Sequence, residues 1–205
     1  MGLGYNVTAN QLAQDYLNLS SVVKKEPKQV QGNVLIGPST IPLVQLRVIE
    51  FFANYYLDGR HATLGDFVSP SVLDSLEAQL KTANKIAEKY TPGKKVWMGE
   101  TSSAWGGGAK NISSSFGAAF MWLDKLGLAA KHNFGGIMRQ AFIQGSYALV
   151  DPNTCNPNPD YWLTVLYKKL VGSAVFPVFV DDFTKKIRLY AHCAHTKWYV
   201  PDQCS

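Results

Sequence analysis

Glu100 stands at the end of a short apolar segment, Lys95 to Gly99, that is expected to form a buried strand. In α/β folds built on parallel strands, the reacting side chains lie at the carboxyl ends of the strands. A carboxylate there can act as a nucleophile or take part in proton transfer. Glu100 is therefore the first candidate for a catalytic residue.

The loop after Glu100 combines small hydroxyl residues, an aromatic residue and three glycines, Gly106 to Gly108. Backbone N–H groups of such a loop can approach an anionic or hydroxyl-rich ligand closely. Trp105 can lie against a sugar ring. The structural alternative is a solvated glutamate that begins a flexible turn, and the pattern alone favours this alternative.

The composition describes a packed globular chain with an excess of positive charge. The 205 residues are 46% hydrophobic and 17% charged, which excludes an intrinsically disordered chain and a collagen-like fibre. No apolar run reaches the roughly 18 to 20 residues of a membrane-spanning helix. The net charge of +5 favours polyanionic partners without naming one. Motifs for phosphate, dinucleotide or nucleic-acid binding are absent.

Two features of the chain are typical of one part of a secreted protein. The start carries no signal peptide, yet three glycosylation sequons occur, at Asn6, Asn18 and Asn111. Cysteines are present at three positions, which leaves an odd thiol: Cys155, Cys193 and Cys204. We therefore expect a fragment whose two ends both lack sequence.

Strand and helix patterns alternate along most of the chain. Helices are expected over 8–23, 69–91, 114–131 and 160–170, and strands over 34–36, 48–57, 95–99 and 136–142. Phe116, Phe120 and Leu123 are expected to form the core face of the third helix. The expected core face of the fourth comprises Trp162, Leu163, Leu166 and Leu170.

This alternation predicts a parallel sheet with right-handed crossovers. Four strands are too few for a closed eight-stranded barrel of about 250 residues, so half a barrel is expected. The tail changes character, because residues 187–193 alternate between apolar and polar as in a half-exposed antiparallel strand.

Several long motifs resemble the heparanases, glycoside hydrolase family 79. Residues 94–108 are similar to the segment that carries the nucleophile of that family. The likeness continues, in order along the chain, through 120–128, 138–140, 159–163 and 168–172, and it includes 55–60 and 189–193. It therefore spans most of the chain from Tyr55 onward.

The resemblance implies a (β/α)8 barrel, of which residues 1–172 would be the C-terminal half, followed by the first strands of a β-sandwich over 173–205. It implies retaining cleavage of β-glucuronide linkages in heparan sulfate, with two carboxylates about 5–5.5 Å apart and no cofactor or metal. The full-length protein would be secreted, lysosomal, or held in the extracellular matrix or at the cell surface.

Individual residues match the functional positions of the family. Glu100 would be the nucleophile, and the backbone N–H groups of Gly106 and Gly107 would bind the uronate carboxylate together with Tyr147. Three further matches line the cleft beside the nucleophile: Tyr55, Arg60 and Gln140.

The sequence departs from the family at the second catalytic carboxylate. That glutamate belongs to an Asn-Glu-Pro motif, which this sequence lacks, and residues 6–15 resemble the segment that follows it. Glu50 is expected about six residues before the end of its strand, and Asp151 is expected to cap a turn, so neither replaces it. A His-His pair of the family is replaced by Ala53-Asn54, and a basic loop by 39–43.

The remaining candidates have ordinary structural explanations. His192 and Cys193 are neighbours on a strand and point to opposite faces, and no fourth ligand is evident, so we expect no metal site. Cys193 matches a sandwich cysteine whose partner in the family lies further on; Cys204 could substitute. The lysines at 24–28 and 168–169 are typical of solvated helix ends.

Two functions remain open. The first is a heparanase-type retaining endo-β-glucuronidase, of which this chain would be a piece that is inactive alone because general-acid help is worth about 10²–10⁴-fold. It would need the missing N-terminal half of its own barrel as a partner. The second is a non-catalytic protein of the same fold that binds heparan sulfate or another partner. Glu100 and the glycine loop favour the first, and the missing acid/base glutamate favours the second.

Overall fold

The computed structural model describes residues 57–195 throughout. It also describes the strands at 36–38 and 48–51 and four positions in a helix: Gln11, Gln14, Asn18 and Ser21. The rest of the helix expected over 8–23 lies outside the described residues, as do Asn6, Tyr55, the Ala53-Asn54 pair, the 39–43 loop and Cys204.

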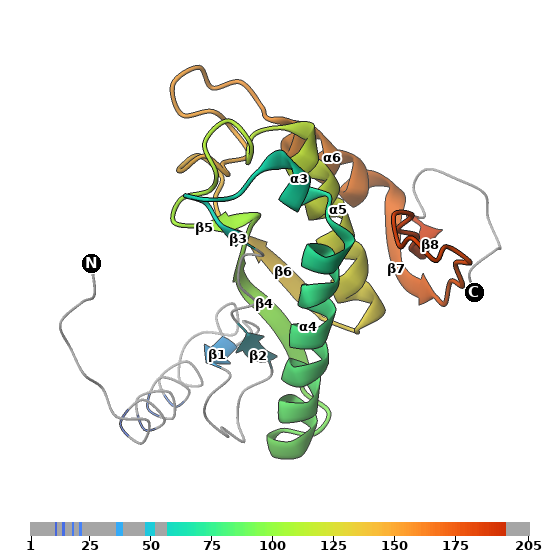
Figure 1. Ribbon diagram of the computed structural model, residues 1–205. Helices are drawn as coiled ribbons and strands as arrows, with labels where there is room; N and C mark the ends of the chain where they lie inside the picture. Colours follow the sequence, from blue (N-terminus) through green and yellow to red (C-terminus); the bar gives the residue numbers. More distant parts are fainter. Residues whose placement is uncertain are drawn as a thin grey trace.

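A four-stranded sheet forms the centre of the fold. Its strands are β1 (Ile36–Pro38), β2 (Val48–Phe51), β4 (Lys95–Thr101) and β6 (Gly136–Arg139), paired in this order. All three pairs are parallel, which confirms the parallel α/β prediction. Strands that are neighbours in the sheet also follow one another along the chain, and the helices α4, α5 and α6 lie together beside the sheet (Figure 1).

Helix α4 (Pro70–Tyr90) follows its sequence pattern closely. Ser69 is the N-cap and Pro70 occupies the first turn, where a missing N–H costs nothing. Leu76 and Leu80 are fully buried and pack against Met98 of β4. This core attaches the helix to the strand that carries Glu100.

Helix α5 (Phe116–Lys131) buries a different face from the one predicted. Phe116, Phe120 and Leu123 are 80%, 37% and 42% exposed, so their assignment to the core was wrong. The buried face instead includes Asp124 and Lys125. The helix is apolar on almost every side, so periodicity did not identify the face that packs.

The short helix α3 (Leu64–Phe67) precedes α4. Helix α6 (Pro159–Leu170) also buries a different face from the one predicted. Trp162, Leu166 and Leu170 are each more than half exposed, whereas Asp160 is buried. The helix contacts α5 through a hydrogen bond of 2.9 Å from the Trp122 indole to the Thr164 hydroxyl. The strand that follows begins directly at Val171, so no loop separates it from the helix.

A second, two-stranded parallel sheet lies next to the first. It consists of β3 (Leu57–Asp58) and β5 (Ala104–Trp105). The single strand predicted over 48–57 is thus two short strands in different sheets. The strand predicted over 136–142 ends earlier, at Arg139.

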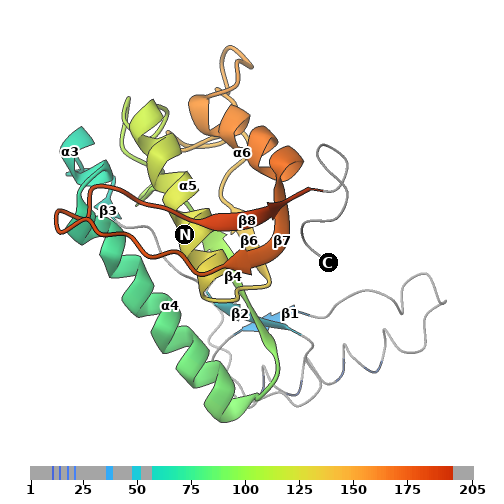
Figure 2. The same ribbon diagram turned by 90° about the vertical axis from the view of Figure 1, so that its right-hand side faces the viewer.

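The tail forms an antiparallel hairpin of β7 (Val171–Phe176) and β8 (Ala191–Ala194). The hairpin lies on the opposite side of the helices from the central sheet (Figures 1 and 2). The alternating strand predicted from residue 187 begins only at Ala191. Cys193 is buried and disulfide-bonded, whereas Cys155 is an exposed free thiol.

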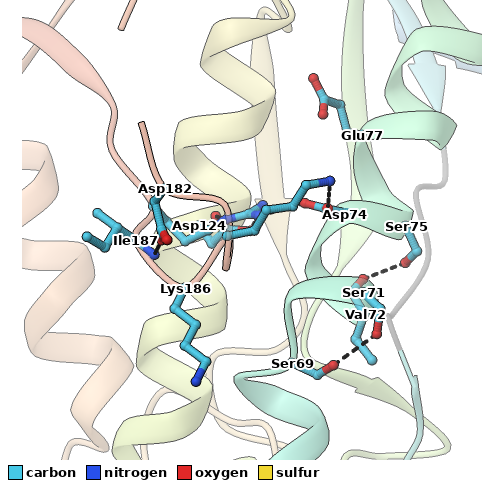
Figure 3. A network of polar contacts seen from close by, with 12 residues as sticks. Ser69, Ser71, Val72, Asp74, Ser75, Glu77, Asp124, Asp182, Lys186 and Ile187 are labelled. Carbon is cyan, nitrogen blue, oxygen red and sulfur yellow. Dashed lines mark hydrogen bonds and ion pairs between the residues drawn. The ribbon is translucent and has the colours of Figure 1, made fainter. Parts of the chain in front are cut away.

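Ion pairs attach the tail to the helices. The Arg188 guanidinium binds Asp124 of α5 through Nε at 2.7 Å and Asp74 of α4 through a terminal nitrogen at 2.6 Å. Tyr190 donates a hydrogen bond of 2.5 Å to Asp124. Figure 3 shows Asp74 and Asp124 next to the segment that carries Asp182 and Ile187.

Glu77 of α4 is predicted to make the stability of this fold depend on pH. Its Oε1 lies 2.9 Å from His132 Nε2 and 3.2 Å from Lys131 Nζ. Burial opposes ionisation, but the hydrogen bonds of His132 and Lys131 outweigh it and lower the pKa of Glu77 to about 2. A lowered carboxyl pKa contributes stability above the unfolded value, near 4.5, and this contribution is lost as the pH falls towards about 2.

Glu77→Gln should therefore lower the free energy of unfolding by about 1–2 kcal/mol at neutral pH, since Glu77 is still partly exposed. Urea unfolding of both proteins across this pH range checks the prediction, and the two curves should converge at the acid end. The exposed Glu88→Gln is the matched control. The prediction would be contradicted if the free energies of unfolding of Glu77→Gln and the parent differed by the same amount at every pH.

Candidate active site

Glu100 is the penultimate residue of β4, which continues to Thr101 and so is two residues longer than the predicted strand over 95–99, and its side chain is half-buried. Before it on the strand, Val96 and Met98 are buried against the helices. Strict alternation along a strand would place Glu100 on the same helix-facing side as Met98. The pairing with β6 prevents this.

A bulge in β4 turns Glu100 to the other face of the sheet. Met98 pairs with Ile137, and Thr101 pairs with Arg139. Three steps along β4 thus match two along β6, so that Gly99 and Glu100 together oppose one residue. Thr101 returns to the helix-facing side, where it is fully buried. Alternation from Thr101 therefore puts Glu100 on the face away from the helices.

The residues after Glu100 are buried and held by several hydrogen bonds. Lys125 Nζ of α5 donates to Thr101 Oγ1 and to the Ser102 carbonyl, both at 2.5 Å. The Ser103 and Ser113 hydroxyls are 2.8 Å apart. The Gln140 N–H donates to the Thr101 carbonyl at 3.0 Å. The backbone of Gln140 therefore lies beside the residue that follows Glu100, and the role of its side chain beside the nucleophile stays a prediction.

The three glycines of the loop have two different environments. Gly106, Gly107 and Gly108 all have positive φ, of 80°, 93° and 90°. Among the described residues, apart from the adjacent positions in the chain, no heavy atom lies within 4 Å of where a Cβ would stand on Gly106 or Gly107, so a ligand has space there. A Cβ on Gly108 would meet the Tyr147 nitrogen at 2.8 Å. The first two glycines are thus open, and the third packs against Tyr147.

Tyr147 is joined to the glycine loop from the segment after β6. It is 8% exposed, and the neighbouring Ser146 N–H donates to the Gly107 carbonyl at 2.6 Å. Arg139 fixes the same segment, since it donates to the Tyr147 carbonyl at 2.7 Å. The glycine loop and Tyr147, which were predicted to bind one carboxylate, are therefore adjacent.

Arg60 and Trp105 form another pair at this loop. The Arg60 guanidinium lies 4.8 Å from the centre of the Trp105 ring, and the Gly59 N–H donates to the Trp105 carbonyl. Arg60 also binds Asp58, and this hydrogen bond is the main reason that the pKa of Asp58 is lowered to about 2. Arg60 is thus held in place and charged, on the exposed side of Trp105.

Sequence reasoning missed a buried set of charged residues behind these loops. Arg139 pairs with Asp160 and lies 4.7 Å from the Trp122 ring centre. Burial raises the pKa of Asp160 although Arg139 opposes this. Burial, and then Arg139, lower the pKa of Lys125. The sequence did carry one sign of this buried set, because its charged residues stand inside otherwise apolar helix and strand segments.

Glu50 lies on β2 and pairs with Trp97 of β4. Only Phe51 follows it in the described strand, and residues 52–56, which the prediction also assigned to this strand, lie outside the described residues. Glu100 stands three residues beyond Trp97 on β4. The backbone of Glu50, which is level with Trp97, is therefore about 10 Å from the level of Glu100 along the strand direction. The register therefore supports the conclusion that Glu50 does not stand beside Glu100.

Two of the sequon asparagines are described. Asn18 and Asn111 are both exposed, and Asn111 has a φ of 61°. Their glycosylation remains a prediction. Within the described part of the chain, no group of three or more His, Cys, Asp or Glu side chains is placed to hold a metal ion, and no helix is long and apolar enough to cross a membrane.

Comparison with known proteins identifies the family. Residues 46–127 match the model of the glycosyl hydrolase family 79 N-terminal domain. Rat heparanase is 43% identical over an alignment of 202 residues that covers 90% of this chain and 37% of that protein. Human inactive heparanase-2 is 32% identical over 94% of this chain and 36% of its own length. The chain thus spans little more than a third of these relatives.

The fold matches solved glycoside hydrolases. A 4-O-α-L-rhamnosyl-β-D-glucuronidase from Fusarium oxysporum superposes with a TM-score of 0.57 at 19% identity, covering 80% of this chain and 38% of that one. This supports a glycoside-hydrolase-like α/β fold. With these matches the resemblance seen in the sequence is confirmed: the chain belongs to glycosyl hydrolase family 79, among the homologues of the heparanases.

Proposed function

We propose that this chain carries the nucleophile of a retaining β-glucuronidase that acts on heparan sulfate. The observation that carries the proposal is the bulge at Gly99 and Glu100, because alternation beyond it is expected to put the carboxylate on the face away from the helices. The open glycines Gly106 and Gly107 and the adjacent Tyr147 supply donors for a uronate carboxylate. The similarity to heparanase supports the choice of substrate.

In the proposed reaction, a Glu100 oxygen attacks the anomeric carbon of the glucuronide. A bond forms between that oxygen and the carbon, and the bond from the carbon to the leaving oxygen breaks with its electron pair. A second carboxyl group, about 5–5.5 Å from Glu100, would give the leaving oxygen a proton. The 205 residues hold no Asn-Glu-Pro motif for this role. We infer that the natural substrate needs a carboxyl group from a further part of the barrel.

The exposed apolar face of α6 supports the inference that further barrel elements pack against this chain. Trp162, Leu166 and Leu170 lie on one side of this helix and are each more than half exposed. Apolar patches of this kind are typical of surfaces that meet another protein surface. We propose that this face meets further elements of a (β/α)8 barrel, and that the hairpin of β7 and β8 begins a second, β-sandwich domain.

The experiment uses a substrate that needs no acid. A 2,4-dinitrophenyl 2-deoxy-2-fluoro-β-glucuronide has a leaving group that departs as a stable phenolate, and the fluorine slows hydrolysis of the ester that forms. The full chain should gain one fluoroglucuronyl group, located at Glu100 by peptide mass spectrometry. Glu100→Gln should abolish the labelling, at least about 10³-fold, because an amide is a far weaker nucleophile. The exposed Glu88→Gln is the matched control and should label as the parent does.

A second candidate function is binding without catalysis. The absent acid/base motif and the 32% identity to human inactive heparanase-2 favour it. In that case the parent chain would bind heparin but would not be labelled at Glu100. Labelling at Glu100 decides for the first function.

The exposed sequons lead to a prediction about the cell compartment. We propose that the protein passes through the secretory pathway and carries a glycan on Asn111, which is exposed. Treatment of the native protein with an N-glycanase should reduce its mass and convert Asn111 to aspartate. An unmodified Asn111 in protein isolated from its source would contradict this.

A further inference from the structure

Lys125 is a fully buried lysine that the proposed reaction does not use. It lies on α5, whose neighbouring residue Asp124 faces the tail hairpin. Lys125 instead faces the sheet, and its Nζ donates to Thr101 Oγ1 and to the Ser102 carbonyl. These two acceptors belong to the first two residues after Glu100.

The contact stands directly behind the bulge. A one-residue shift in strand pairing moves every side chain to the opposite face of a sheet. If β4 lost its bulge, Glu100 would pair where Thr101 now pairs and would face α5. Two hydrogen bonds from the buried amino group of Lys125 to Thr101 and Ser102 oppose that shift, because the shift would put Glu100 where Thr101 now stands and Thr101 where Ser102 now stands.

Burial of an amine is costly, and the direction of the Lys125 pKa agrees with this cost. Burial lowers the pKa well below its usual value, Arg139 lowers it further, and Asp124 opposes them. An apolar side chain of similar length would fill the same space without this cost. The position is therefore poorly explained by packing alone.

We propose that Lys125 is a positioning residue, which holds the bulged register of β4 and so keeps Glu100 on the face away from the helices. The proposal rests on the proposed role of Glu100 for its kinetic test. Its structural test does not depend on that role.

The kinetic test compares Lys125→Met with the parent in the labelling reaction with the fluoroglucuronide. The maximal labelling rate should fall roughly 10- to 100-fold, the range expected when buried acceptors lose their hydrogen-bond donor. The reagent concentration that gives half of this rate should change little, because the glycine loop is not altered. Lys131→Met, on the exposed side of the same helix, is the matched control and should label normally.

The structural test follows two backbone amides by hydrogen exchange. The Gln140 N–H bonds the Thr101 carbonyl beyond the bulge, and the Gly135 N–H bonds the Val96 carbonyl before it. Lys125→Met should speed exchange at Gln140 roughly 10- to 100-fold and leave Gly135 protected. This measurement needs no reaction at Glu100.

The double variant Lys125→Met/Thr101→Val separates position from stability. In Lys125→Met the buried Thr101 hydroxyl loses the donor that it has in the parent. The second substitution removes this hydroxyl, so the urea midpoint of the double variant should be higher than that of Lys125→Met. Labelling should stay slow, because nothing holds the register. Recovery of the labelling rate together with stability would overturn the proposal.

Two further results would overturn it. These are parent-like labelling of Lys125→Met, and unchanged exchange at Gln140. If the parent chain itself is not labelled, the proposed function of Glu100 fails, and the exchange at Gln140 against Gly135 still decides whether Lys125 holds the register.

Discussion

Replacing Arg188 by alanine should lower the free energy of unfolding by about 3–5 kcal/mol, the usual result of removing one partner of a buried ion pair. Arg188 binds Asp124 through two nitrogens, at 2.7 and 3.1 Å, and Asp124 is almost fully buried. Without the guanidinium, the hydrogen bond from Tyr190 is the one that the carboxylate keeps among the described residues. Burial and Asp124 raise the pKa of that phenol, so it stays a donor but supplies no charge.

The measurement is urea unfolding, with Lys185→Ala as the matched control. Lys185 belongs to the same segment and binds Asp74 at 3.1 Å, but its side chain is 67% exposed. Its loss should cost less than about 1 kcal/mol, as exposed ion pairs usually do. Equal effects of the two variants would show that the hairpin is attached by apolar contacts and not by Arg188.

Replacing Gly108 by alanine should damage both stability and reactivity. Its φ of +90° alone costs a residue with a Cβ about 1–2 kcal/mol. The new Cβ would also stand 2.8 Å from the Tyr147 nitrogen and 3.1 Å from the Ser113 Cβ, and crowding of this kind adds about 1–3 kcal/mol. Because Tyr147 and the loop must separate, labelling of Glu100 should fall about 100-fold, as expected for a displacement near 1 Å.

Gly93→Ala is the control for backbone strain. Its φ is +74°, but no heavy atom lies within 4 Å of the new Cβ. This variant should lose only the conformational part, about 1–2 kcal/mol, and should label normally. If Gly108→Ala labelled as fast as Gly93→Ala, the contact between the glycine loop and Tyr147 would have no part in the reaction.

Local signals in the sequence were sufficient for the elements of the site. Ser69 and Pro70 specify the start of α4, and the spacing of Leu73, Leu76 and Leu80 specifies its buried face, because capping and helical period act within a few residues. The apolar run from Val96 placed Glu100 at the end of a strand. The glycines after it indicated a loop open to a ligand, and the motifs around them identified the family.

The direction of Glu100 and the burial of charged residues required distant contacts. Alternation in β4 predicts the wrong face for Glu100, and only the pairing with β6 creates the bulge that turns it. Helix α5 is apolar on most sides, so its sequence does not distinguish Phe116 from Met121 as a core residue. Its buried charges are stable because Arg188, 64 residues away, binds Asp124, and because Thr101 and Ser102 accept hydrogen bonds from Lys125. Such partners come together only when the chain folds, and for that reason no local sequence pattern predicts them.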